Sequence, residues 1–190
     1  MVTHMRGDQA PRAISEPGAA SKSPDSPPAE RFYDMRIDRH GTWHHEGRPI
    51  ARMALVKLFA SVLRKESDNS YWLVTPVERG RIDVEDVPFV IVELAVEEAG
   101  SKQRLNVRSN LDEWITIGPD HPLLFRKPPD TPQTAAAVPY VDIRRGLEGK
   151  LLRPVYYELA DHCEPHRQDG VTRYGIWSDG QFFAWDDQPT

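Results

Sequence analysis

Cysteine is nearly absent from this 190-residue sequence, because Cys163 is the only one. A single cysteine excludes a disulfide within the chain and any zinc or iron–sulfur site built from several cysteines. Long hydrophobic runs are absent too, and no stretch approaches the roughly 18 uninterrupted apolar residues of a membrane-spanning helix. Arg6, Asp8 and Arg12 interrupt the N-terminal stretch in which a signal peptide would need its apolar run. We therefore expect a cytoplasmic protein with no membrane span.

An excess of positive charge is also missing. The chain carries 24 Lys and Arg against 29 Asp and Glu, which gives a net charge of −5. Such a chain does not hold nucleic acid through its overall charge, although a local basic patch is compatible with the total.

Aromatic residues are missing from the beginning of the chain, and every one of them lies from Phe32 onward. Residues 1–30 hold 5 of the 17 prolines and are otherwise rich in small and acidic residues. This composition does not bury enough apolar surface to offset the entropy lost on ordering. The sequence predicts a disordered tail over 1–30 and a folded region after it.

The folded region reads as short, mostly antiparallel strands with two helices, which is an α+β class. Apolar residues at helical spacing predict helices over 49–64 and from 154 to about 163. Alternating and β-branched runs predict strands over 35–38, 43–47, 71–74, 81–84, 89–96, 105–108, 113–117 and 140–143, with a turn over 78–80. Asp179-Gly180 predicts a closing hairpin with a turn of the primed type between 176–177 and 182–183.

The second half of the chain repeats features of the first in the same order. Ile37-x-Arg39, Gly41 and Arg48-Pro49 recur as Ile143-x-Arg145, Gly146 and Arg153-Pro154. This order favours two related units of antiparallel strands plus one helix each, over 31–98 and 99–190, with chance matching of short motifs as the alternative. Six prolines within 118–139 predict a long surface connection and a candidate boundary between structural units.

Seven segments of the sequence together form a pattern that is specific enough to indicate a protein family. They are GRPIARMALVKLF at 47–59, YWLVTPVE at 71–78, DVEDVPF at 83–89, RSNLD at 108–112, GPDHP at 118–122, RPVYYEL at 153–159 and GIWSDGQFF at 175–183. In these segments the chain resembles a bacterial family known as domain of unknown function 1285. The resemblance implies a duplicated α+β core whose second unit is pleckstrin-homology-like. It implies no established reaction and no catalytic residues.

Both predicted helices begin at an Arg-Pro pair. Proline fits the first helical position, which would make Arg48 and Arg153 the N-cap residues, and an arginine side chain accepts no backbone N–H there. Unpaired N–H groups, the positive end of the helix dipole and a cation would then meet at one place that suits a phosphate or a carboxylate. A carboxylate of the protein itself, such as Asp38 or Asp83, is the alternative occupant. Arg52 falls in the apolar stripe of the first helix and is expected to extend past its end or to pair at the interface between the units.

Arginine and tyrosine are the residues that binding surfaces use most, and the groove between two units is a usual ligand site. The candidate binding residues are Arg48, Arg52, Arg108, Asn110, Asp112, His121, Arg153, Tyr156 and Tyr157. We expect a non-enzymatic binding or regulatory protein of signal transduction, whose partner is an unidentified protein or an anionic ligand. A nucleotide and a segment of nucleic acid both remain open as that ligand.

A small hydrolase is the competing function. Cys163 with His162 or His166 would supply a nucleophile and a base, and histidines 40, 44 and 45 form a second cluster. A cysteine at the end of an amphipathic helix is more commonly a small buried apolar residue, and neither cluster offers a full set of metal ligands. The Walker, G-x-G-x-x-G, H-E-x-x-H and G-x-S-x-G motifs are absent. We therefore predict no catalytic residue, no cofactor and no bound metal.

Overall fold

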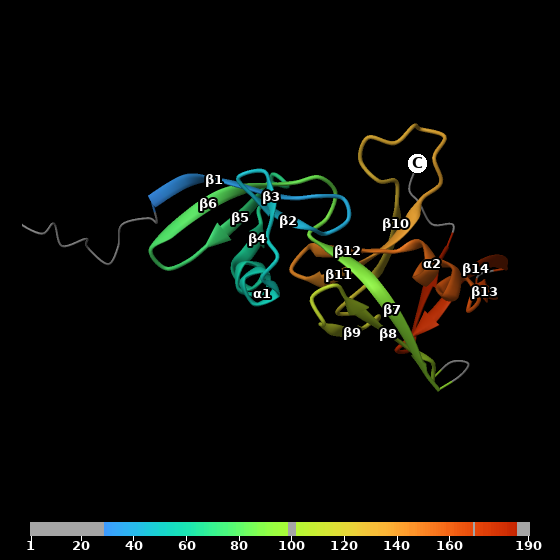
Figure 1. Ribbon diagram of the computed structural model, residues 1–190. Helices are drawn as coiled ribbons and strands as arrows, with labels where there is room; N and C mark the ends of the chain where they lie inside the picture. The colour runs from blue at the N-terminus through green and yellow to red at the C-terminus, as the bar shows by residue number, and fades with distance from the viewer. Residues whose placement is uncertain (1–28, 99–101, 169, 186–190) are drawn as a thin grey trace, which may run out of the picture.

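The computed structural model describes residues 29–98, 102–168 and 170–185. These residues form two six-stranded sheets, one three-stranded sheet and two helices. Figure 1 shows two lobes side by side: the first sheet with α1 makes the first lobe, and the other two sheets with α2 make the second. No helix in the described ranges is long and apolar enough to cross a membrane.

The first lobe is a mixed sheet with one helix packed on it. Its elements are β1 (Ala29–Ile37), β2 (Trp43–His45), β3 (Arg48–Pro49), α1 (Met53–Val62), β4 (Leu63–Lys65), β5 (Tyr71–Val74) and β6 (Glu78–Val84). The strand order is β3-β2-β1-β6-β5-β4, and β1 runs parallel to β6. Helix α1 buries Val56 and Ala60, and Phe59 stacks on Trp43 with ring centroids 6.2 Å apart. These helix positions are three and four residues apart, so they form the one face that covers the sheet.

The second lobe contains the second and third sheets. Its elements are β7 (Phe89–Glu97), β8 (Arg104–Ser109), β9 (Trp114–Thr116), β10 (Leu123–Arg126), β11 (Val138–Arg144), β12 (Leu147–Leu151), α2 (Arg153–Ala160), β13 (Glu164–Gln168), β14 (Val171–Ser178) and β15 (Gln181–Ala184). The sheet orders are β10-β11-β12-β7-β8-β9, in which β7 runs parallel to β12, and β13-β14-β15. The buried Ser178 hydroxyl joins these two sheets, because it donates to the Ile117 carbonyl at 2.6 Å and accepts from the Leu105 N–H at 2.9 Å.

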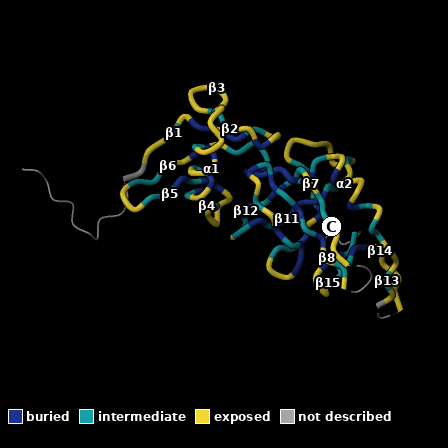
Figure 2. Tube along the Cα trace, turned by 60° about the horizontal axis from the view of Figure 1, so that its bottom comes forward, coloured by how far each residue is buried: buried dark blue, intermediate teal, exposed yellow. Residues whose placement is uncertain are grey.

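One core cluster includes residues of both lobes. Ile37 and Trp43 of the first lobe and Phe89 and Ile143 of the second are all no more than 1% exposed. Figure 2 shows buried segments inside both lobes and exposed segments at their outer edges. Along β5 and β8 the buried positions alternate with less buried ones, as expected of strands that cover a core with one face.

The coarse α+β prediction agrees with a fold that is mostly sheet with two helices. The predicted closing hairpin is β14–β15, in which Ser178 pairs with Gln181. Asp179 and Gly180 between them have φ angles of 48° and 75°, as a type I′ turn requires. Residues 1–28 of the predicted 1–30 tail lie outside the described residues, whereas residues 29 and 30 belong to β1.

The chain's organisation differs from the sequence-based expectations at three places. The turn expected at 78–80 is the start of β6, because the chain reverses earlier, where the Thr75 N–H donates to the Glu78 carbonyl at 2.9 Å. Strand β7, expected to end the first unit at residue 98, pairs with β8 and β12 in the second sheet. The Pro-rich segment 118–139 is no boundary between units, because it contains β10, which pairs with β11 inside the second lobe.

The helix starts also differ from the prediction. Arg48 pairs with His45 across a tight two-residue turn, so Pro49 continues the β2–β3 hairpin and α1 starts only at Met53. Arg52 is the N-cap residue of α1 and is exposed, so it does not lie in the apolar stripe. Helix α2 starts at Arg153 itself. Neither Arg48 nor Arg153 is an N-cap residue, so the predicted arrangement of an arginine at each N-cap is wrong.

The order of elements is the order that a duplication predicts. A hairpin, a helix and three strands follow one another as β1–β2, α1 and β4–β6, and again as β11–β12, α2 and β13–β15. The two-residue strand β3 has no counterpart in the second series. The duplication itself stays a prediction.

Candidate functional site

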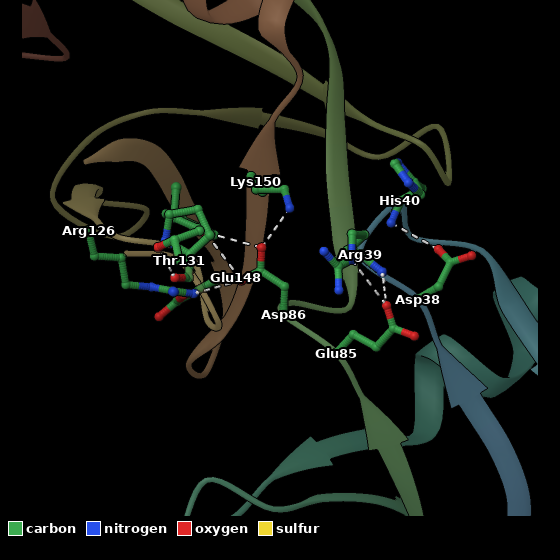
Figure 3. Close-up of polar contacts among 11 residues, drawn as sticks. Asp38, Arg39, His40, Glu85, Asp86, Arg126, Thr131, Glu148 and Lys150 are labelled. Atoms are coloured by element: carbon green, nitrogen blue, oxygen red, sulfur yellow. Dashed lines mark hydrogen bonds and ion pairs between the residues drawn. The ribbon is translucent and has the colours of Figure 1, made fainter. Parts of the chain in front are cut away.

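The segment between β6 and β7 ties the two lobes together. Glu85 accepts hydrogen bonds from the side chain of Arg36 and, at 3.1 Å, from the backbone N–H of Arg39, both in the first lobe. Asp86 accepts a hydrogen bond from Lys150 Nζ of the second lobe at 2.6 Å. Figure 3 shows the two carboxylates directed to opposite sides of the segment. We call these five residues the interlobe clasp.

The Asp86 side of the clasp is nearly closed to water. The Asp86 side chain is 3% exposed, and Arg126 Nη2 lies 3.6 Å from it and 2.6 Å from Glu148. Burial and the Asp86 charge raise the pKa of Tyr140, whose hydroxyl donates to Asp86. Burial, with the charge of Glu148, raises the pKa of Tyr71 in the first lobe to about 12. Because each charge here is paired, the cluster joins the lobes and offers nothing to a ligand.

Helix α1 is tied to the second lobe at a different place. Arg144, at the end of β11, donates Nη2 to the Ala60 carbonyl at 2.9 Å and Nη1 to the Glu113 carboxylate at 2.8 Å. Lys57 Nζ donates to Asp112 at 2.8 Å, and this hydrogen bond and the lysine charge lower the pKa of Asp112. These contacts hold the C-terminal half of α1 against the turn between β8 and β9.

A cleft of about 500 Å³ lies beside these contacts, between β4 and the turn of the β11–β12 hairpin. It is lined by Ser61, Leu63, Arg64, Lys65, Arg144, Arg145 and Leu147. Four of these residues are cations and none is acidic, in a chain of net charge −5. We call this cavity the basic cleft. Its volume is that of small-molecule sites, and its concentration of one charge sign attracts anions.

Three of the four cations have no acidic partner among the residues that the structure describes. No described carboxylate oxygen lies within 4.0 Å of Arg64, Lys65 or Arg145. Arg64 is nonetheless held in place, because its Nη1 donates to the carbonyls of Leu63 at 2.6 Å and Ser61 at 3.1 Å. The basic cleft therefore presents positive charge that the described part of the protein does not neutralise.

Arg145 has a backbone conformation that is unusual for arginine. Arg145 and Gly146 form the two-residue turn between Arg144 and Leu147, with φ angles of 50° and 77°. A residue with a Cβ atom loses roughly 1–2 kcal/mol in this region, and type I′ turns favour Asn or Asp at the first position. A guanidinium is thus placed at the cleft at a conformational cost, which is a common feature of functional positions.

A second, smaller cavity of about 330 Å³ adjoins the basic cleft and shares Ser61 and Arg144 with it. Its remaining lining residues are Lys57, Ala60, Leu111 and Glu113. We call it the side hollow. Its surface differs from that of the basic cleft, because it offers apolar groups and a carboxylate.

Three of the nine predicted binding residues meet beside the side hollow. Arg108 pairs with Asp112 at 3.0 Å. Asn110 links the lobes, because its Nδ2 donates to the Gly41 carbonyl at 3.2 Å and its Oδ1 accepts from the Val90 N–H at 3.2 Å. All three side chains thus make contacts within the protein.

The other six predicted residues are not brought to one place, although three of them lie on α2. They are Arg48, Arg52, His121, Arg153, Tyr156 and Tyr157. They lie in β3, at the start of α1, before β10 and along α2, and none of them lines the basic cleft or the side hollow. A binding role for the nine residues stays a prediction.

The candidate hydrolase residues also lie away from the basic cleft. Cys163 follows α2, is half-buried and packs against the core. His166 packs against Trp177 and Phe182, with ring centroids 5.0 and 4.8 Å away. Within the described ranges no three His, Cys, Asp or Glu residues are grouped as a metal site would need. Nothing in this arrangement supports the hydrolase alternative.

Two sheet lobes, a clasp between them and a basic cleft define a two-lobed α+β protein. The family model described as "Domain of unknown function (DUF1285), N-terminal domain" matches residues 25–87, and "Protein of unknown function (DUF1285), C-terminal domain" matches residues 88–185. The chain belongs to the DUF1285 family, which confirms the resemblance seen in the sequence. The matched regions meet directly after the clasp segment, where the first lobe passes into the second.

Two crystal structures of bacterial DUF1285 family proteins are similar to this chain. The protein from Silicibacter pomeroyi DSS-3 is 38% identical, with 86% of this chain and 88% of that chain covered and a TM-score of 0.74. The protein from Shewanella baltica OS155 is 31% identical, with 68% and 91% covered and a TM-score of 0.51. No curated protein matches the chain.

The basic cleft is the feature that the sequence analysis missed. Its signal in the sequence is two pairs of consecutive basic residues: Arg64-Lys65 follows a helical pattern, and Arg144-Arg145 precedes a glycine turn. Neither pair is unusual by itself, because charged residues commonly occupy solvated ends of elements. Only the packing of the two lobes places the pairs on opposite walls of one cavity.

Proposed function

We propose that this protein is a non-enzymatic binding and regulatory protein of signal transduction, whose ligand is an anion held in the basic cleft. The observation that carries the proposal is the convergence of Arg64, Lys65 and Arg145 on one cavity without a described acidic partner. An arginine fork binds phosphate or carboxylate oxygens in pairs, and lysine adds a point charge.

The two walls of the cleft come from different lobes. Arg64 and Lys65 lie in β4 of the first lobe, and Arg144 and Arg145 end the β11–β12 hairpin of the second. An anion bound to both walls therefore bridges the lobes. Its binding energy depends on how the lobes are placed, and a ligand of this kind favours the arrangement in which both walls reach it. This coupling supports a regulatory role.

Three finer features belong to the proposal. The second lobe, in which α2 packs against β7, is pleckstrin-homology-like, the two units are related by duplication, and the protein acts in the cytoplasm. The element order on the two sides of the clasp supports the duplication.

Calorimetric titration of the full chain with tripolyphosphate tests the proposed site. The wild type is expected to bind one anion per chain. The variant Arg64→Ala/Arg145→Ala is expected to lose about 1.4 kcal/mol per guanidinium, which is roughly a hundredfold weaker Kd in total. The matched control Arg81→Ala/Arg167→Ala removes two exposed arginines outside the cleft and should stay within about twofold of the wild type.

Three results would contradict this site. An absence of binding to the wild type refutes the proposal. An equal loss of affinity in the control variant means that the anion is attracted by surface charge and not held in the basic cleft. A loss confined to Arg48→Ala/Arg153→Ala would instead favour the residues predicted from the sequence.

A further inference from the structure

We infer that the anion is a nucleoside diphosphate or triphosphate, with its phosphates in the basic cleft and its nucleoside in the side hollow. This inference rests on the proposed function, because it requires the basic cleft to hold an anion. It adds the chemical class of the ligand and its direction in the site.

The first argument is that the two cavities adjoin. They are separate but share Ser61 and Arg144 in their linings, so a ligand that extends past these two side chains reaches both. Together they have one strongly basic end and one end of mixed character. A nucleotide has this asymmetry, because its charge is concentrated in the phosphates. Inorganic phosphate is small and would leave the side hollow unused.

The second argument is the chemistry of the side hollow. Leu111 and Ala60 offer apolar contact to a base or a sugar, and Glu113 offers carboxylate oxygens that accept hydrogen bonds from amino and hydroxyl groups. The same carboxylate neutralises Arg144 at 2.8 Å, so this end offers a phosphate less positive charge than the basic cleft does. The polar groups therefore favour one direction for the ligand, with its phosphates toward Arg64 and Arg145.

The third argument concerns length. At the side hollow and beyond it the cations are already paired: Lys57, which lines the hollow, with Asp112 at 2.8 Å, and Arg108 with Glu93 at 2.6 Å. A nucleic acid strand needs a basic track that continues along its backbone. These neutralised pairs end the track at the hollow, which favours a mononucleotide over a strand.

The test uses two substitutions at one position. Lys57 lines the side hollow but not the basic cleft, and its side chain is 43% exposed. Lys57→Ala and Lys57→Trp remove the same charge, but only Lys57→Trp fills the hollow. The full chain of each form is titrated with tripolyphosphate and with ATP, GTP, CTP and UTP, and the measured quantity is the ratio of Kd values for tripolyphosphate and for the tightest nucleotide.

The wild type is expected to bind that nucleotide about tenfold more tightly than tripolyphosphate. Lys57→Ala leaves the hollow open and should keep a several-fold preference for the nucleotide, whereas Lys57→Trp should reduce the ratio to about one. A ratio of one in the wild type overturns the nucleotide inference but leaves the proposed anion site intact, whereas binding of neither probe defeats the proposed function itself. Tighter binding of a single-stranded oligonucleotide than of any nucleotide would also overturn the inference.

A second variant keeps the test decisive if Lys57→Trp does not fold. Glu113→Gln removes the charge that neutralises Arg144 and weakens the acceptor that faces the nucleoside. Tripolyphosphate should then bind several-fold more tightly, and the preference for the nucleotide should fall by about the same factor. An unchanged preference would refute the placement of the nucleoside in the side hollow.

Discussion

Removal of the Asp86 carboxylate is expected to destabilise the protein by about 3 kcal/mol. Truncation of one partner of a fully buried ion pair costs roughly 3–5 kcal/mol, because the other charge is left unpaired. Asp86 is 3% exposed, but Lys150 is 18% exposed and Arg126 33% exposed, and both would regain some hydration. Arg126 also keeps Glu148 at 2.6 Å. These two facts place the expected cost at the lower end of the range.

The assay is urea unfolding of Asp86→Ala, Lys150→Met and the double variant. The double variant should be more stable than the sum of the single losses predicts, by about 1–2 kcal/mol, because the two groups interact directly. Asp83→Ala, an exposed carboxylate in β6, is the matched control and should change the free energy of unfolding by less than about 0.5 kcal/mol. A loss below about 1 kcal/mol for Asp86→Ala, or exact additivity, would refute the assignment of Asp86 to the interlobe clasp.

Three further predictions concern single residues. Burial, with the Glu148 charge, raises the pKa of Tyr71 from 10.0 to about 12. The stability contributed by the protonated Tyr71 hydroxyl is therefore complete below pH 10 and is lost as the pH rises through about 12. Tyr71→Phe should leave the ultraviolet titration near pH 10 unchanged, and loss of a group titrating there would contradict this. Burial alone would raise the pKa of Asp38, but hydrogen bonds from His44 and the N–H groups of Thr42 and His40 lower it. The destabilisation caused by Asp38→Asn should therefore shrink as the pH falls through and below 3.8, and a pH-independent difference would be inconsistent with this. Arg145→Asn should raise the free energy of unfolding by about 0.5–1 kcal/mol, because Asn suits the type I′ turn, while tripolyphosphate affinity falls about tenfold; loss of stability would show that the guanidinium supports the fold instead.

Local signals in the sequence predicted those elements that depend on neighbouring residues. The Asp179-Gly180 turn and the strands β5 and β8 follow from turn chemistry and from alternation over a few residues. The expected end of the first unit differs because of a pairing between distant segments. Strand β7 looks like a continuation of the first unit along the chain, but its parallel pairing with β12 places it in the second sheet.

The structure has a cleft between its two lobes, and the sequence analysis named none of the cations that line it as a site residue. A groove between the two units was expected, and Asn110 does link the two lobes. Arg48 was assigned to a helix start because proline follows it, but the β2–β3 hairpin uses that proline. The basic cleft depends on the distance between a surface of the first lobe and a surface of the second, which tertiary contacts such as Arg144 to the Ala60 carbonyl set. The spacing of residues in the sequence does not predict that distance.

Amide chemical-shift mapping of the ¹⁵N-labelled chain during titration with tripolyphosphate tests the central claim most directly. The account predicts that the largest shifts fall in two separate segments, 61–65 and 144–147, that they saturate together at one anion per chain, and that both are lost in Arg64→Ala/Arg145→Ala. Shifts centred on 48–52 and 153–157, or shifts spread over the surface without saturation, would contradict an anion site in the basic cleft.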